Sequence, residues 1–253
     1  MKTTPVIGVW DDHDYGCNNG DKTFPKKHAV REIFLDFIGE PADSDRRVER
    51  DTGIYQDYVI ITPDKIKVHY ILLDVRFDFD PDTRDRLGAR QIEWLEAKFQ
   101  EHKDSDITLI ASGVQILPDR YFPTEHFEWE TKKTLLDLIR KYEKSGVVLL
   151  SGDVHFAQFY HTNCQSLTGY NLPELTTSGL THHVNGFIPR ADKALIMATN
   201  TFWNVRHLVV LTSYLLRQVR YSWTSTLASL LSKGRVNQMI LKLSSKLETY
   251  RIK

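Results

Sequence analysis

Residues 147–157 read VVLLSGDVHFA, and this segment is the most informative about the fold. Its first four residues form a short apolar run that is typical of a strand buried in a sheet, and Gly152 ends that run. Asp153 and His155 follow at once. In open α/β sheets the ligand crevice lies beyond the carboxyl ends of the strands, so the pattern predicts functional side chains here. By itself, Gly-Asp-x-His also fits an ordinary turn.

A second polar cluster follows another apolar run near the start of the chain. Residues 6–10, VIGVW, predict a buried strand, and residues 11–20, DDHDYGCNNG, come directly after it. Carboxylate, amide and imidazole side chains together suit hard or borderline divalent metals and iron. Three Asp within four residues also repel one another, and a bound cation relieves that repulsion. Turn and helix-cap chemistry explains one such cluster equally well, but two clusters at separate strand ends favour a metal site.

Strand and helix patterns alternate along most of the chain. Strands are predicted at residues 54–61, 67–73, 107–111, 147–150, 156–161 and 174–177. Helical spacing covers residues 89–99, 129–142 and 28–38, and the last of these is expected to present one apolar face made of Val30, Ile33, Phe34, Phe37 and Ile38. This order predicts a layered α/β domain rather than an all-α or all-β one.

Composition narrows the class of protein. The 253 residues suffice for one large domain, and 41% hydrophobic and 26% charged residues are typical of a globular protein. The formal net charge is zero, and nothing in it indicates a nucleic-acid partner. The sequence shows neither a signal peptide nor a transmembrane segment, which needs about 18 to 20 apolar residues. It leaves the compartment undetermined.

Residues 190–253 differ from the rest of the chain. They carry eleven Lys or Arg and two Asp or Glu, a balance of +9, which leaves −9 for the remainder. Their periodicity predicts basic amphipathic helices at residues 204–220 and 222–247. Two interpretations stay open: the apolar faces pack on the domain, or they make weak contact with an anionic membrane surface. We therefore divide the chain into a domain at residues 1–189 and a basic tail at residues 190–253.

Five motifs, in order, resemble those of the PhoD-like (alkaline phosphatase D) metallophosphatases of the calcineurin-like metallophosphoesterase superfamily. They are GVWDDHDYG at residues 8–16, LLDVR at 72–76, LGARQIEWL at 87–95, LLSGDVHFA at 149–157 and ELTTSGL at 174–180. The motifs span about residues 6–183. The resemblance implies an αββα sandwich of mixed sheets flanked by helices, with metals held at strand ends.

The resemblance also implies an activity and roles for individual residues. The activity is metal-dependent hydrolysis of phosphate mono- or diesters by a metal-activated hydroxide, and the complete family fold holds two metals, described as divalent ions or iron and calcium. His13 would stabilise the phosphoryl charge or protonate the leaving oxygen. Arg76 would contact phosphate, unless it only forms a salt bridge beside Asp74. The metal-ligand positions would be Asp12, Asn18, Asp153 and His155.

The chain departs from the family pattern at three places. Only five residues precede the first predicted strand, so the family's upstream Gly-Asp-x-x-Tyr strand, which carries further metal ligands, is expected to be missing. Phe79 stands where the family often has a second Arg, and the basic tail replaces a C-terminal Asn-Phe-Gly strand. Two hypotheses follow for this N-terminally truncated relative. It is an active phosphatase that uses the residues present, or an impaired member that serves as a metal- or phosphate-binding or interaction module.

Overall fold

The structure, a computed structural model, describes residues 7–49, 51–119, 124–162 and 165–178. The predicted basic tail and the domain boundary at residue 189 lie outside the described residues. Within the described ranges, no helix is both long enough and apolar enough to cross a membrane.

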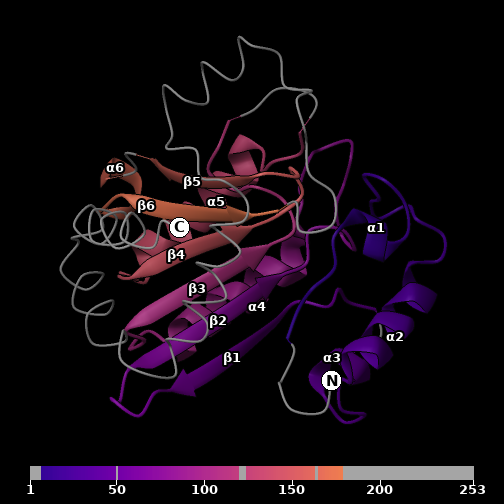
Figure 1. The fold of residues 1–253 in the computed structure, drawn as a ribbon, viewed down its shortest axis with the longest axis horizontal. Helices are drawn as coiled ribbons and strands as arrows, with labels where there is room; N and C mark the ends of the chain where they lie inside the picture. Colours follow the sequence, from indigo (N-terminus) through magenta and orange to yellow (C-terminus); the bar gives the residue numbers. More distant parts are fainter. Residues whose placement is uncertain (1–6, 50, 120–123, 163–164, 179–253) are drawn as a thin grey trace, which may run out of the picture.

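A six-stranded mixed sheet forms the centre of the fold (Figure 1). Its strand order is β1-β2-β3-β4-β6-β5. The four inner strands are parallel, and the two edge strands, β1 and β5, run antiparallel to their neighbours. The strands are β1 (Gln56–Ile61), β2 (Lys67–Leu73), β3 (Ile107–Ser112), β4 (Val147–Ser151), β5 (Ala157–Thr162) and β6 (Leu172–Thr177).

Two long helices make the crossovers between the parallel strands. α4 (Gly88–Glu101) connects β2 to β3, and α5 (Trp129–Lys141) connects β3 to β4. Both helices pack against the same face of the sheet, where their apolar side chains share one core with β2, β3 and β4 (Figure 1). That core includes Ile71, Leu95, Ile110, Leu135 and Leu149. The short helix α6 (Gln165–Thr168) lies between β5 and β6 along the chain.

The N-terminal helices pack beside the sheet through a second, smaller core. They are α1 (Asp12–Tyr15), α2 (Lys27–Ile38) and α3 (Asp45–Val48). Trp10, Tyr15, Leu35, Ile54 and Phe77 are all buried in this core, and Phe77 lies just beyond the carboxyl end of β2. The small core therefore holds α1 at the end of the sheet where the parallel strands finish.

The predicted α/β class, a mixed sheet flanked by helices, is confirmed, and six of the seven predicted strands are present. The described residues contain one sheet. The strand predicted at residues 6–10 is wrong for residues 7–10, which form no regular structure. Their apolar character has another cause, because Trp10 fills the small core and donates its indole hydrogen to Asp74 at 2.9 Å.

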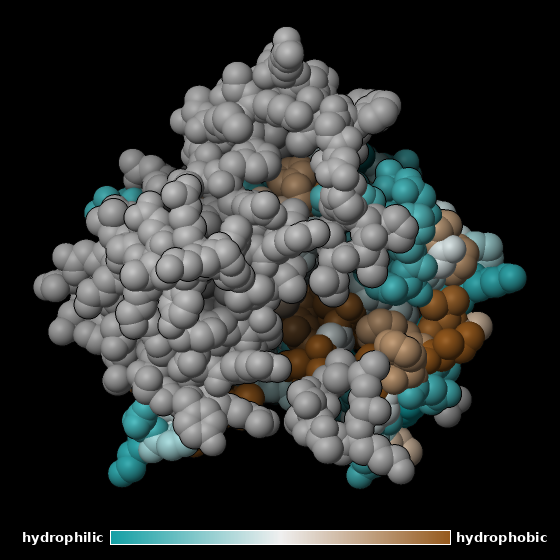
Figure 2. All heavy atoms as spheres, in the orientation of Figure 1, coloured by the Kyte–Doolittle hydropathy of each residue, from teal (hydrophilic) through white to brown (hydrophobic). Residues whose placement is uncertain are grey.

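The predicted apolar face of α2 is also partly wrong. Val30, Phe34 and Ile38 do pack against the small core, but the fully buried apolar residue of this helix is Leu35. Ile33 and Phe37 are 66% and 81% exposed, and Figure 2 shows hydrophobic residues at the surface in the region of α2.

Candidate metal centre

Asp74 anchors the site to the end of β2. Its carboxylate is buried and accepts hydrogen bonds from the indole of Trp10, at 2.9 Å, and from the backbone N–H of Ile54, at 2.8 Å. The backbone N–H of Arg76 also donates to it, at 2.9 Å. A carboxylate that accepts several hydrogen bonds in the interior fixes the groups that donate them. Asp74 therefore joins the segment before α1 to the loop after β2.

Gln91 of α4 supports the same junction from the other side. Its Oε1 accepts the backbone N–H of Asp74 at 2.9 Å, and its Nε2 donates to the backbone oxygen of Asp74 at 2.6 Å. The LLDVR and LGARQIEWL motifs therefore meet at Asp74. Gln91 and Asp74 hold the end of β2 and the start of α4 together.

Arg76 is fully buried and lies between two acidic side chains. Its Nε donates to Asp11 Oδ1 at 2.7 Å, and its Nη2 donates to Glu125 Oε2 at 2.7 Å. Burial would lower the pKa of Arg76, but the attraction of Asp11 and Glu125 outweighs it and raises that pKa. Arg76 therefore forms salt bridges with Asp11 and Glu125, as the alternative interpretation expected, and only its backbone bonds to Asp74.

A second buried guanidinium completes this ionic group. Arg86 Nη2 lies 3.1 Å from Glu125 Oε1, and its Nε donates to the backbone oxygen of His126 at 2.8 Å. The guanidinium carbon of Arg86 lies 4.3 Å from the centre of the Phe79 ring. Phe79 thus packs against an Arg that comes from a later position in the chain.

The loop after β4 brings the SGDVH motif to Asp11. The backbone N–H of Gly152 donates to the oxygen of Gly113, which follows β3, at 2.9 Å. A Cβ at Gly113 would lie 2.7 Å from Asp11 Cγ, so the lack of a side chain there permits this approach. Asp153 and His155 both have left-handed backbone, with φ of 66° and 58°. Such φ values are uncommon for residues other than Gly and are found at functional sites.

Three carboxylates from these two loops form one cluster. Asp11, Asp12 and Asp153 each offer an oxygen, and these oxygens lie within 4.8 Å of one another. Burial, helped by repulsion from Asp11 and Glu125, raises the pKa of Asp153 to about 7. Burial likewise raises the pKa of Asp11, although Arg76 opposes this. With Glu125, this part of the molecule holds four carboxylates and two guanidinium groups, those of Arg76 and Arg86, and only Asp11 and Glu125 pair with the guanidinium groups. This excess of negative charge and the oxygen donors fit a divalent cation.

The structure brings some of the predicted site residues together and leaves others at the rim. Asp12 and Asp153 share the cluster, and the oxygens of Asp12 accept the backbone N–H groups of His13, at 2.7 Å, and Asn19, at 3.1 Å. The side chain of His13 is 75% exposed, and its Nε2 lies 4.0 Å from Asp12 Oδ2. Asn18 is exposed in the loop after α1. His155 is also exposed and does not belong to the three-carboxylate cluster.

Sequence reasoning missed the functional positions of Asp11 and Glu125. Asp11 belongs to the acidic cluster in the sequence. The sequence alone does not tell which of several adjacent side chains in a turn point into a site and which point to solvent. In the structure Asp11 is the N-cap of α1, so the helix-cap interpretation also holds for this residue. Glu125 has no motif around it, and its contacts with Arg76 and Arg86 are what mark it.

Comparison with known proteins supports the fold and leaves the function to be tested. No protein-family model and no curated protein matches the sequence. A solved structure described as that of PhoD matches with a TM-score of 0.57 and 18% sequence identity, over 76% of this chain and 43% of PhoD. The chain therefore spans less than half the length of that protein. At this identity the similarity concerns the fold, and the chain has a PhoD-like fold.

Proposed function

We propose that this chain hydrolyses phosphate esters with the help of divalent metal ions held by Asp11, Asp12 and Asp153. The observation that carries the proposal is the convergence of these three carboxylates at the ends of the parallel strands, beside a buried Arg. The reaction class comes from the resemblance of the motifs to those of PhoD-like metallophosphatases. The PhoD-like fold supports it.

The three Asp side chains would hold the metal, and Asn18 and His155 are further candidate ligands on the adjoining loops. A bound divalent ion would supply Lewis-acid polarisation of a phosphoryl oxygen and a lowered pKa for a water molecule. The oxygen-rich donor set favours Mg²⁺, Ca²⁺ or Mn²⁺, and iron fits if His155 takes part.

The surrounding side chains have separate tasks. Arg76 orients Asp11 through its Nε. Its buried Nη1 has no hydrogen-bond partner among the described residues, and it would donate to a phosphoryl oxygen if a neighbouring side chain moved aside. His13, exposed beside Asp12, is suited to donate a proton to the leaving alkoxide of a phosphate mono- or diester. Trp10 and Gln91 act only by holding Asp74 and, through it, the loop that carries Arg76.

Hydrolysis of bis-p-nitrophenyl phosphate tests the proposal. The full chain is assayed with iron, Ca²⁺, Mn²⁺ or Zn²⁺, beside the variant Asp153→Asn. Asn adopts left-handed backbone more readily than most residues, so this variant keeps the loop while it removes a charged ligand. We expect kcat/KM to fall about 100-fold or more.

Asp137→Asn is the matched control, because Asp137 is exposed on α5 and pairs only with Lys133 among the charged groups of the described residues. It should keep wild-type activity. Equal activity of Asp153→Asn and Asp137→Asn would contradict the proposal. Metal or phosphate binding by a folded chain without turnover would also contradict it, and would favour the impaired-relative interpretation.

A further inference from the structure

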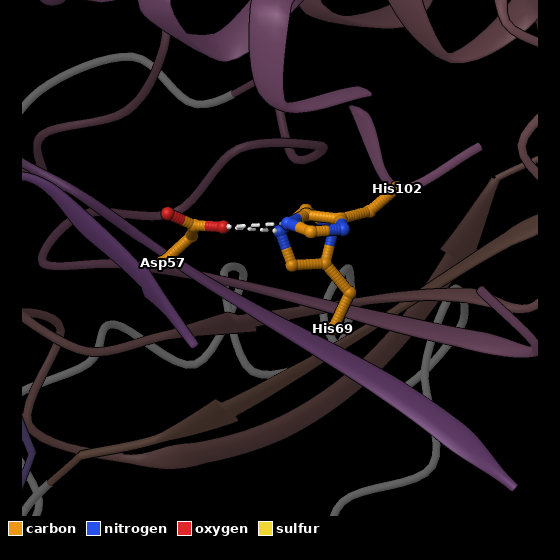
Figure 3. Close-up of side chains that lie close together, drawn as sticks. All are labelled: Asp57, His69 and His102. Carbon is orange, nitrogen blue, oxygen red and sulfur yellow. Dashed lines mark hydrogen bonds and ion pairs between the residues drawn. The ribbon is translucent and has the colours of Figure 1, made fainter. Parts of the chain in front are cut away.

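A second group of metal-ligand side chains lies away from the candidate metal centre. Asp57 comes from β1, His69 from β2 and His102 from the residue after α4 (Figure 3). Asp57 pairs with Ile71 in the sheet, and Ile71 is two residues from His69, so Asp57 and His69 point to the same face. Asp74 and Arg76 follow the carboxyl end of β2, whereas His69 lies near its start. The group therefore sits toward the opposite end of the sheet.

The distances in this group are those between ligands of one ion. His69 Nε2 lies 3.0 Å from Asp57 Oδ2, and His102 Nε2 lies 3.4 Å from the same oxygen. One ligand atom from each residue lies within 4.8 Å of the others, and both rings turn toward the carboxylate (Figure 3). A tetrahedral zinc ion with bonds of about 2.0 to 2.2 Å separates its ligand atoms by about 3.3 Å. Small side-chain movements would therefore admit an ion.

The surroundings of His69 and Asp57 favour the protonation states that a metal requires. The side chain of His69 is fully buried, and burial lowers its pKa, which favours the neutral ring. Nε2 offers a lone pair to a metal when the ring proton is on Nδ1. Burial alone would raise the pKa of Asp57, but the hydrogen bond from His69 and the charge of Lys98 outweigh it and lower that pKa. Neutral imidazole and ionised carboxylate are the forms that bind metal.

Two charged side chains, Lys98 and Glu101, lie beside the group. Lys98 Nζ lies 3.5 Å from Asp57 Oδ1, but it also pairs with Glu101 at 2.9 Å and is partly exposed, so it can move away. Glu101 Oε1 lies 3.5 Å from His102 Nε2 and adds negative charge at the open side. Lys144 donates to the backbone oxygen of His102 at 2.6 Å and so fixes the backbone of that residue.

We propose that Asp57, His69 and His102 bind a divalent transition-metal ion, Zn²⁺ or a close chemical relative, that joins edge strand β1 and the end of α4 to β2. Two imidazoles and one carboxylate favour such ions over Mg²⁺ and Ca²⁺, unlike the three carboxylates of the candidate metal centre. Three protein ligands leave the fourth position to water. His69 Nδ1 has no hydrogen-bond partner among the described residues, so the affinity should be lower than at a zinc site whose His ligands are all supported.

Cobalt binding by the full chain tests the proposal, because tetrahedral Co²⁺ has a visible absorption band that six-coordinate Co²⁺ largely lacks. We expect this band in the wild type and in Asp12→Asn/Asp153→Asn, and its loss in His102→Gln. His102 is partly exposed, so this variant should fold. His28→Gln, at a His that is 56% exposed on α2, is the matched control and should keep the band.

A second measurement uses Zn²⁺ itself. Zn²⁺ should raise the Tm of the wild type and of His28→Gln more than that of His102→Gln, which keeps the candidate metal centre. No tetrahedral band in the wild type, or an unchanged band in His102→Gln, would overturn the proposal and leave a hydrogen-bonded group only. Loss of the band in Asp12→Asn/Asp153→Asn would equally overturn it, by moving the ion to the other site. The proposal does not depend on phosphate-ester hydrolysis, and His102→Gln should keep any such activity.

Discussion

Gly113 shows how one missing side chain shapes the candidate metal centre. A Cβ at this position would lie 2.7 Å from both Cγ and Oδ1 of Asp11, whereas one at Gly8 would meet no atom within 4 Å. Ala at position 113 must therefore push Asp11 away from Arg76. We expect Gly113→Ala to lower kcat/KM for bis-p-nitrophenyl phosphate about tenfold or more, since displaced catalytic groups lose rate steeply. Gly8→Ala is the control, and equal activity of the two variants would show that the position of Asp11 does not matter.

For single residues, the sequence predicted which residue types would lie close together but not which atoms would be in contact. The proximity of Asp12 and Asp153 was predictable, because each lies in a polar cluster expected at an end of the sheet. The partners of Arg76 were not, since Glu125 comes from a loop with no local pattern. The group of Asp57, His69 and His102 could not be predicted from the sequence either. Its members are far apart in the chain, and only strand register and the length of α4 bring them together.

Among the elements, the junction of β2 and α4 depends on Gln91. This buried side chain satisfies both the N–H and the oxygen of Asp74, and its Nε2 also reaches the oxygen of Leu87 at 3.2 Å. Gln91→Leu has a similar size but leaves these groups without partners. We expect it to lower the free energy of unfolding in urea by about 2 to 3 kcal/mol and to reduce activity as well. Gln100→Leu, exposed on the same helix, should change stability by less than about 0.5 kcal/mol, and an equal loss in the two variants would contradict this role.

Periodicity located the strands and long helices well, because each has enough residues to show its period. It failed where core packing or a very short element determines the local structure. Residues 7–10 are apolar because Trp10 fills a core, not because they pair in a sheet. The four-residue helices α3 and α6 are too short to show a period. Ile33 and Phe37 have core-like spacing but remain exposed, since α2 packs through Val30, Phe34 and Leu35.

For the whole molecule, the order of the strands places two ligand groups of different chemistry toward opposite ends of one sheet. Asp11, Asp12 and Asp153 gather where the parallel strands finish, and Asp57, His69 and His102 gather near the start of β2. The parallel arrangement follows from the two crossover helices, which the sequence predicted. The place of β6 between β4 and β5 is a property of tertiary pairing, and no local pattern indicates it.

The measurement that tests the central claim most directly is the recovery of phosphodiester hydrolysis after metal removal. The wild type, Asp12→Asn/Asp153→Asn and His102→Gln are stripped of metal and assayed with bis-p-nitrophenyl phosphate as each divalent ion is added back. We expect activity to return in the wild type and in His102→Gln, and to stay at least about 100-fold lower in the double variant. Full activity in the stripped wild type, or recovery of the double variant to the wild-type level, would contradict the assignment of the reaction to the Asp11, Asp12 and Asp153 site.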